Sequence, residues 1–353
     1  MKKIGLLTFC DTTNFGSWLQ TYALYKKIKD LGYEIEVIRY ICDGIELREK
    51  LTIKKLKSLP IESIILQVKK QLCFSIYTLM NMKISKKYRR DDIYKTNKKY
   101  VNFLLGSDLV WDLNITYGDT TYLFDFLEDD KVRFAYAASS GRDYIPDSQR
   151  EIFTKCLKKF NYITVRESGM VSDIENISGC SVYNVCDPTL LIEGSEWKKF
   201  VNKDNCNGKY VLLYFVDGHG NLSRIAKKYA RENGLELLAI NRDFNIDVDN
   251  QINPISISEF LSYIYYAEKI FTASYHGMMF SIIFNKQFAF YPFAPATRML
   301  SVAKRFDVEN MNIESNSFDV NQHIDYKLVN NRVYDFREES IKHLNNMLSE
   351  MRK

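Results

Sequence analysis

The chain has 353 residues, 46% of them hydrophobic and 26% charged, and a formal net charge of +5. Its length favours two domains, and 24 Tyr and 22 Phe exclude a chain that is disordered throughout, because so many aromatic side chains need a core. The low content of Pro (6) and Gly (15) excludes collagen-like and proline-rich architectures, and 7 Cys without a CxxC pair favour neither a zinc ribbon nor a disulfide framework.

The N-terminal segment predicts a strand, a loop, a helix and a second strand. Residues 3–9 form a short apolar run, residues 11–17 carry turn and capping side chains, and residues 18–31 have helical apolar spacing that ends at Gly32. Residues 34–40 are the second predicted strand. The first apolar run is too short for a secretory signal, so we expect a cytoplasmic protein. This unit is typical of a doubly wound α/β domain.

Residues 51–100 form a basic block, with 13 Lys or Arg against three acidic residues. We expect a helical insertion over about 45–100, whose basic face is either simply solvated or directed at an anionic lipid or lipid-linked substrate. Its longest apolar stretch, residues 61–82, contains Lys69 and Lys70 and makes a poor membrane span. Nucleic acid is not expected as a partner, because no reader motif accompanies the charge.

The pattern of strands and helices continues to the end of the chain. Further strands are predicted over residues 100–105, 122–127, 132–138, 162–165, 210–216, 235–240, 269–273 and 287–291. Helices are predicted over residues 148–160, 222–233, 257–267, 278–284 and 335–352. Ser256 and Glu259 are spaced as a capping box.

A polar stretch at residues 198–209 predicts a domain boundary. We therefore expect an N-terminal domain over 1–200, a C-terminal domain over 201–334 and a terminal helix over 335–353. Both domains are predicted to be α/β, with Rossmann-like, doubly wound sheets that face a cleft where a small charged substrate binds.

His276 is the strongest single candidate for chemistry. Among the 4 histidines it alone lies between a predicted buried strand and a predicted helix start, at Gly277. A helix start favours phosphate or carboxylate groups, and Gly277 would let a ligand approach the backbone closely. His276 could donate a proton or a hydrogen bond to an anion there, or it could cap the turn as a structural residue.

Two arginines also follow predicted strands. Arg166 suits bidentate binding of a carboxylate or phosphate, but it could equally pair with Glu167 or Asp173. Arg298 lies in a loop that leads into a helix and could serve as a second anion ligand.

Polar residues near the first helix and after the strand at 100–105 are candidates for ligand contacts. Asn14, Gly16 and Gln20 surround the first loop, although Asn14 could simply cap the helix. Ser107 and Asp108 could orient a sugar hydroxyl or cap a turn. No GxGxxG, GxSxG, HExxH, P-loop or EF-hand sequence occurs, which disfavours the functions typical of those motifs.

Several loop motifs, in order between residues 3 and 300, together resemble those of the polysaccharide pyruvyl transferases. They are 5–9 with 14–16 and 19–20, 106–108 with Trp111, 136–139, 166–168, 187–189, and 272–277 with 280–281. The resemblance implies a two-domain fold like that of GT-B glycosyltransferases. It also implies transfer of a pyruvyl group from phosphoenolpyruvate to a sugar of a surface-polysaccharide precursor, as in exopolysaccharide or capsule synthesis, giving a ketal across two hydroxyls.

The resemblance further implies roles for individual residues. Arg166 and His276 match family positions for clamping the donor anion, and His276 is expected to be the acid or the phosphate contact. The full expected donor set is Arg166, Ser274, His276, Gly277 and Arg298, and the expected acceptor set is Asn14, Gly16, Gln20, Ser107 and Asp108. Phosphoenolpyruvate is then a co-substrate, with no metal ion or other cofactor. From the basic block at residues 51–100 we further expect the enzyme to be held at the inner face of the plasma membrane, with a lipid-linked saccharide as acceptor.

One departure from the family pattern concerns the donor. Some members carry an arginine two residues before the motif histidine, where this chain has Ser274, so Arg298 would have to replace that contact. Two alternatives therefore stay open. One is a GT-B-type glycosyltransferase with a nucleotide-sugar donor, and the other is a non-catalytic, carbohydrate-binding member of the fold.

Overall fold

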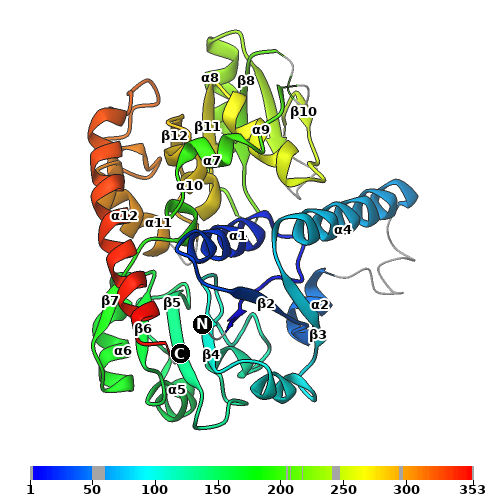
Figure 1. The fold of residues 1–353 in the computed structure, drawn as a ribbon. Helices are drawn as coiled ribbons and strands as arrows, with labels where there is room; N and C mark the ends of the chain where they lie inside the picture. The colour runs from blue at the N-terminus through cyan, green and yellow to red at the C-terminus, as the bar shows by residue number, and fades with distance from the viewer. Residues whose placement is uncertain are drawn as a thin grey trace. The chain divides into compact units, whose positions relative to one another are not determined.

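A computed structural model describes residues 3–49, 60–203, 206, 208–216, 218–240, 247–293 and 297–351. The chain divides into two compact units (Figure 1). Unit 1 is Met1–Leu191 together with Phe336–Lys353, and unit 2 is Ile192–Asp335.

The first division, after Leu191, comes before the predicted boundary at residue 200, whereas the second, after Asp335, lies one residue from the predicted one. The chain enters unit 2 before residue 200 because Trp197 packs its ring edge-on against Phe280, with the ring centroids 5.0 Å apart. The C-terminal helix α12 (Tyr326–Ser349) begins before residue 335. Its last turns belong to unit 1, where the Ser340 hydroxyl accepts a hydrogen bond from the Cys186 N–H (2.8 Å).

Unit 1 contains a parallel sheet of seven strands within the described residues, in the order β3-β2-β1-β4-β5-β6-β7. Its strands are β1 (Ile4–Leu7), β2 (Ile35–Tyr40), β3 (Ile84–Tyr88), β4 (Asn102–Leu105), β5 (Val132–Ala138), β6 (Tyr162–Val165) and β7 (Val182–Asn184). Its helices are α1 (Phe15–Asp30), α2 (Asp43–Glu49), α4 (Ile61–Asn81), α5 (Arg150–Leu157) and α6 (Met170–Ser178). Short 3-10 helices are η1 (Ile93–Lys98), η2 (Thr121–Leu123), η3 (Asp147–Gln149) and η4 (Pro188–Leu190).

The central strands are apolar on both faces, as a parallel sheet covered by helices requires. Leu7, Phe103 and Leu105 pack into one core cluster, which also contains Phe153 of α5 and Ile174 of α6. The alternate residues of the same strands are equally buried and face the other side of the sheet.

Two predicted elements of unit 1 are wrong. The basic block is not entirely helical, because β3 pairs in parallel with β2 at the edge of the sheet; Lys86 and Lys87 are exposed on this strand, as is common for an edge strand. Residues 122–127 form no strand: Phe124 has a φ of 58° and stacks on Phe160 at 5.6 Å, so this apolar run fills the core without pairing. Residues 50–59 of the basic block lie outside the described part of the chain.

Unit 2 contains a second parallel sheet, with five strands in the described residues and the order β10-β9-β8-β11-β12. The strands are β8 (Tyr210–Tyr214), β9 (Glu236–Ile240), β10 (Asn250–Gln251), β11 (Lys269–Thr272) and β12 (Gln287–Phe290). The helices are α7 (Gly194–Lys198), α8 (Leu222–Glu232), α9 (Ile257–Tyr266), α10 (Tyr275–Ile283) and α11 (Thr297–Phe306), with the 3-10 helix η6 (Glu309–Met311). The predicted cap of α9 is present, since the Ser256 hydroxyl accepts a hydrogen bond from the Glu259 N–H (3.1 Å).

Each sheet has one place where the strand order reverses. In unit 1 the chain builds outward from β1 through β2 to β3 and then crosses to the other side of β1 to form β4. In unit 2 it builds from β8 through β9 to β10 and crosses to the other side of β8 to form β11. Loops diverge at such switch points, and open α/β sheets bind their ligands in the crevice that results.

The buried Lys269 of β11 makes the stability of unit 2 depend on pH. Burial lowers the pKa of its ammonium group to about 8, although its Nζ lies 4.9 Å from the centre of the Tyr229 ring and donates a hydrogen bond to the Val320 carbonyl. Between pH 8 and the ordinary lysine range, the unfolded chain binds a proton that the folded chain has lost, so stability rises with pH.

We expect Lys269→Met to remove this rise. The difference in free energy of unfolding, wild type minus variant, should increase with pH above 8 by at most about 1.4 kcal/mol per pH unit. Denaturant unfolding at pH 7.5, 8.5 and 9.5 measures it. A constant difference across that range would contradict the buried, proton-releasing lysine.

Candidate functional site

The switch point of unit 1 gathers the five residues predicted to contact the acceptor. Asn14 is the exposed N-cap of α1, and its side-chain oxygen accepts a hydrogen bond from the Ser17 N–H (3.3 Å). Gly16 is buried in the first turn of that helix. Capping, the structural alternative for Asn14, is therefore present, and Asn14 is still open to solvent beside the end of β1.

Gln20 and Ser107 are fully buried and connect the loops after β1 and β4. The Gln20 amide donates to the Thr8 hydroxyl (3.0 Å), which itself donates to the Ser107 carbonyl (2.9 Å). The Gln20 Oε1 and the Ser107 Oγ have no hydrogen-bond partner among the described residues. These two buried residues thus support the loops that form the site.

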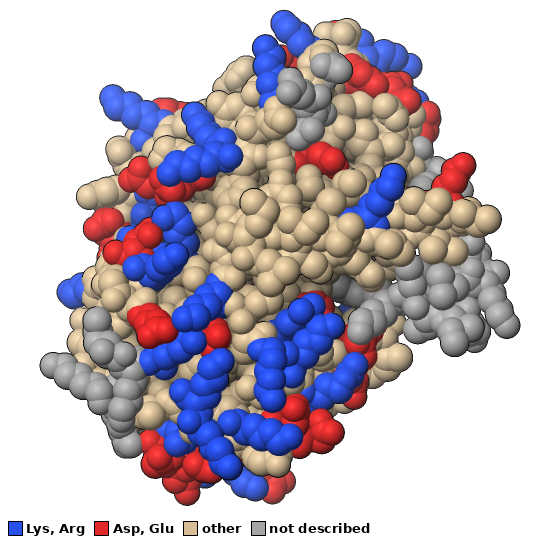
Figure 2. All heavy atoms as spheres, turned by 45° about the vertical axis from the view of Figure 1, so that its right-hand side comes forward, with Lys and Arg blue, Asp and Glu red and all other residues tan. Residues whose placement is uncertain are grey.

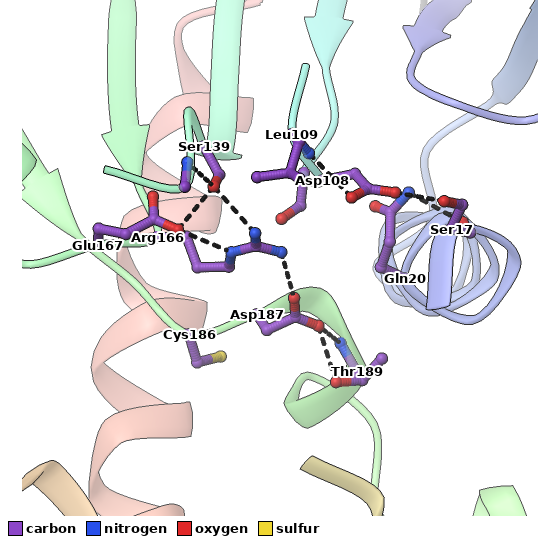
Figure 3. A network of polar contacts seen from close by, with 12 residues as sticks. Ser17, Gln20, Asp108, Leu109, Ser139, Arg166, Glu167, Cys186, Asp187 and Thr189 are labelled. Atoms are coloured by element: carbon purple, nitrogen blue, oxygen red, sulfur yellow. Dashed lines mark hydrogen bonds and ion pairs between the residues drawn. The ribbon is translucent and has the colours of Figure 1, made fainter. Parts of the chain in front are cut away.

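Asp108 is the acidic group of this switch point. Its φ of 81° lies in the left-handed region, which a non-glycine residue adopts only when its surroundings hold it there. One carboxylate oxygen accepts from the Leu109 N–H (2.8 Å), and the other accepts from the Ser17 hydroxyl (Figure 3). Asp108 is thereby held at the end of β4 with its side chain turned toward α1.

Arg166 lies at the centre of a buried polar network that joins the ends of β5, β6 and β7 (Figure 3). Its three guanidinium nitrogens contact Glu167 (3.3 Å), Asp187 (3.1 Å) and the Ser139 hydroxyl (2.9 Å). Asp187 also accepts hydrogen bonds from the N–H (3.0 Å) and hydroxyl (2.8 Å) of Thr189. The pairing with Glu167 that the sequence left open is therefore present, whereas Asp173 pairs with Arg150 instead.

A β-bulge positions Ser139 for this network. The pairing of β5 with β6 shifts register between Ala135 and Ala138, and Ala137 between them has a φ of 51°. Bulges often redirect a side chain next to a functional site. The segments 136–139, 166–168 and 187–189 are separate family landmarks in the sequence, and the structure brings them together.

A pocket beside the same switch point was missed by sequence reasoning. It has a volume of about 240 Å³ and lies among the ends of β1 and β2, strand β3 and helix α4. Its lining combines aromatic and polar side chains, among them Phe9, Asp11, Thr12, Thr13, Arg39, Tyr40, Phe74, Lys87 and Tyr122. Such a mixture suits a ligand with apolar faces and many hydroxyl groups. Only the polar loop 11–17 indicated it in the sequence.

The pocket also contains two cysteines that are poor nucleophiles. Burial raises the pKa of the Cys10 thiol to about 12 and that of Cys42 to about 11. Both are thiols at neutral pH, so covalent catalysis by a thiolate is disfavoured here. Within the described part of the chain, the pocket included, no cluster of three or more His, Cys, Asp or Glu is placed to hold a metal ion.

The switch point of unit 2 contains the histidine motif. Helix α10 begins at Tyr275, before the predicted start at residues 277–278, because Ser274 is its N-cap and accepts from the Gly277 N–H (3.5 Å). His276 is therefore in the first helical turn, nearly buried, with its ring edge-on to Tyr275 at 5.2 Å. Arg298 belongs to helix α11, and its guanidinium lies 5.5 Å from the centre of the Tyr275 ring.

Gly277 serves packing within unit 2. A Cβ at this position would lie 2.3 Å from the Thr272 hydroxyl and 2.7 Å from a Tyr214 ring carbon. Only glycine lets the start of α10 approach β11 and β8 so closely. The close approach that the sequence assigned to a ligand is made by the protein's own side chains.

The predicted site residues thus form two groups. Unit 2 brings Ser274, His276, Gly277 and Arg298 together. Arg166 belongs to unit 1, with the acceptor residues.

We expect Arg166→Gln to destabilise unit 1 strongly, because it leaves Glu167 and Asp187 buried without their cation. Breaking a buried ion pair costs about 3–5 kcal/mol, which lowers the melting temperature of a domain of this size by at least about 6 °C. The matched control is Arg150→Gln, since Arg150 pairs with Asp173 at a position where 39% of its side chain is exposed. That change should cost about 1 kcal/mol or less. Equal shifts in calorimetry would contradict the buried network.

A family model and solved structures are similar to this chain. A family model described as polysaccharide pyruvyl transferase matches residues 14–292. No curated protein matches the chain significantly. A putative UDP-N-acetylglucosamine 2-epimerase from Listeria monocytogenes is similar in structure, with a TM-score of 0.50 and 9% identity over 97% of this chain and 89% of that one.

An alpha-glucosyltransferase in complex with UDP and a 13-mer DNA containing a central A:G mismatch is also similar, with a TM-score of 0.50 and 10% identity over 97% of this chain and 92% of that one. At such low identity these likenesses concern the fold, and they show the GT-B architecture of two α/β units with parallel sheets. Because the family model covers most of the chain, this protein belongs to the polysaccharide pyruvyl transferase family.

Proposed function

We propose that this member of a transferase family moves a pyruvyl group from phosphoenolpyruvate to two hydroxyls of a saccharide, forming a cyclic ketal. The observation that carries the proposal is the group of His276, Ser274 and Arg298 around the start of α10, at the switch point of unit 2. A helix N-terminus with an adjacent guanidinium and imidazole suits a small dianion or trianion.

In the proposed donor site, the phosphate lies at the N-terminus of α10 and the carboxylate is bound by Arg298. Arg298 would thus supply the cation that some family members carry at the position of Ser274. It is suited to this, because its guanidinium lies 5.5 Å from the centre of the Tyr275 ring, and Tyr275 is the residue between Ser274 and His276. His276 contacts the phosphate or donates the proton.

Arg166 receives a different role from the one expected from the family resemblance. Its guanidinium already contacts Glu167, Asp187 and Ser139, and its side chain is only 3% exposed. Binding a donor anion would require breaking two buried ion pairs. We assign Arg166 to positioning: it holds the ends of β5, β6 and β7 behind the acceptor region.

The chemistry proceeds by addition and elimination. Protonation of the methylene carbon of phosphoenolpyruvate makes the methyl group and leaves positive charge on C2, which the first acceptor hydroxyl attacks while losing its proton. The C2–O bond to phosphate then breaks, and phosphate leaves with the bonding electrons. The second hydroxyl attacks the resulting oxocarbenium centre and loses its proton, which closes the ketal. A general acid and a general base suffice, and the scheme uses no metal ion.

The proposed acceptor region is the switch point of unit 1. Asp108 is the only predicted acceptor residue there with a carboxylate, so it is our candidate for orienting or deprotonating an acceptor hydroxyl. The neighbouring pocket, with Asp11, Arg39 and Tyr40, would hold the sugar. We place the enzyme in the cytoplasm, in peripheral contact with the inner face of the plasma membrane, with a lipid-linked precursor of a surface polysaccharide as acceptor.

A thermal-shift titration tests the donor. Phosphoenolpyruvate should raise the melting temperature, whereas pyruvate, phosphate and nucleotide-sugars should have little effect. His276→Gln and Arg298→Gln should each weaken the apparent affinity about tenfold or more, the value of one charge-assisted hydrogen bond. The matched controls His323→Gln and Arg231→Gln change exposed residues of unit 2 and should behave like the wild type. A shift with a nucleotide-sugar alone would replace this proposal by glycosyl transfer.

Asp108→Asn tests the acceptor side. We expect acceptor-dependent release of phosphate from phosphoenolpyruvate to slow by about a hundredfold, while the thermal shift with phosphoenolpyruvate stays unchanged. Asp112→Asn, in the same loop, is the control, because within the described residues its carboxylate accepts from the Asn114 N–H (3.0 Å) alone. Full activity of Asp108→Asn would remove Asp108 from the mechanism.

A further inference from the structure

Helix α4 of unit 1 carries large apolar side chains on its solvent face. Ile61, Ile65, Val68, Leu72, Ile76, Leu79 and Met80 are all exposed, with fractions from 44% for Ile76 to 80% for Met80. The first six follow one another at steps of three or four residues, so they form a single stripe along one face. We refer to these seven residues as the α4 stripe. Contiguous exposed apolar surface of this kind marks a binding surface.

The opposite face of α4 is fixed to unit 1. Phe74 packs against Phe15 at 5.2 Å, and the Trp18 indole donates to the Thr78 hydroxyl (3.0 Å). Phe74 and Thr78 are buried. The outward direction of the stripe is therefore set by packing of the inner face onto α1, and Figure 1 shows α4 extending away from the sheet of unit 1.

Three exposed lysines without an acidic partner among the described residues lie on α4 and on the strand β3 that follows it. Lys69 is exposed on α4, and Lys86 and Lys87 are exposed on β3, which follows α4 in the chain. Within the described residues none of these three has a carboxylate at ion-pair distance, whereas Arg89 and Arg90 of the same block pair with Asp43 and Asp125. In Figure 2 the part that projects at the right is mostly uncharged, and many Lys and Arg side chains, with Asp and Glu among them, lie on the lower part of the visible face.

We propose that α4 is a membrane-surface helix: its stripe enters the interfacial layer of an anionic lipid bilayer, and Lys69, Lys86 and Lys87 contact the lipid phosphates. A helix of 21 residues is about 30 Å long, and an apolar face flanked by lysines is typical of helices that lie in this layer. No helix in the described part of the chain is long and apolar enough to span a bilayer.

Anionic lipid explains the charges better than a second copy of the chain does. Two α4 helices packed stripe to stripe would bring their unpaired lysines together, and like charges at an interface oppose association. A bilayer with anionic lipids instead neutralises each lysine, with a gain of about 1 kcal/mol per residue near the surface.

If α4 lies in the membrane surface, the acceptor of the proposed reaction is a saccharide attached to a membrane lipid. This part of the inference rests on the proposed function. Gln71, Ser75 and Leu79 of α4 also line the pocket at the end of β1. With α4 in the interfacial layer, the pocket lies at the level of the lipid headgroups. A saccharide attached to a membrane lipid would reach it without leaving the bilayer.

Co-sedimentation of the full chain with vesicles tests the inference. Vesicles of phosphatidylcholine with 30% phosphatidylglycerol should bind the protein, and pure phosphatidylcholine vesicles should bind it less. Ile65→Gln/Leu72→Gln/Ile76→Gln should lower the partition coefficient at least about tenfold at both low and high salt, because it removes apolar burial. Lys86→Gln/Lys87→Gln should lower it by about tenfold at low salt only.

Matched controls separate the α4 stripe from general surface hydrophobicity. Leu300→Gln/Leu328→Gln removes two exposed leucines of unit 2 and should leave the partition coefficient within about twofold of wild type. An unchanged melting temperature of the triple variant shows that the inner face of α4 still packs.

Three results would overturn the inference. They are wild type that does not bind anionic vesicles, a triple variant that binds as well as wild type, and a dimer in solution that the triple variant converts to a monomer. The last would assign the stripe to a second copy. The thermal shift with phosphoenolpyruvate needs no lipid, so failure of vesicle binding and failure of the proposed reaction are distinguishable.

Discussion

One buried guanidinium organises the carboxyl edge of unit 1. Arg166 contacts Glu167, Asp187 and Ser139, and so links the ends of three neighbouring strands. Two carboxylates buried beside one another repel unless a cation lies between them, and Arg166 supplies planar donors in three directions. The network and Asp108 lie at the same edge of the parallel sheet, at the ends of β5, β6, β7 and of β4 (Figure 3), which makes the rigidity of that edge depend on a residue that need not touch a substrate.

In unit 2 a close approach between backbone and side chains positions the polar residues. Gly277 lets α10 begin against Thr272 and Tyr214, and this places Ser274 as its N-cap and His276 in its first turn. In both units a group of predicted site residues, with Asp108 in unit 1 and His276 in unit 2, lies where the strand order reverses, because there the loops leave neighbouring strands in opposite directions and open a crevice. The α4 stripe adds an outward-facing surface next to the first of these places.

Much of this could be predicted from local pattern. The strands β5 and β6, the cap of α9 and the polar loops after β1, β4 and β11 were all indicated by runs of apolar residues followed by turn residues. The predictions were wrong where an apolar or basic run of residues has a structural role other than the one predicted. Residues 122–127 are apolar because they fill a core, and residues 84–88 include lysines because β3 is an edge strand.

The sequence by itself determined the α/β class, the two-unit organisation and the family, because apolar periodicity and ordered loop motifs are local properties of the chain. Tertiary structure decided what each polar residue contacts. It paired Arg166 with Asp187 across 21 positions in the sequence, committed Gly277 to internal packing, and left one face of α4 exposed and apolar among the described residues of unit 1. These contacts depend on which strand ends become neighbours and on which face of a helix packs against the core. The spacing of residues along the chain does not determine either of them.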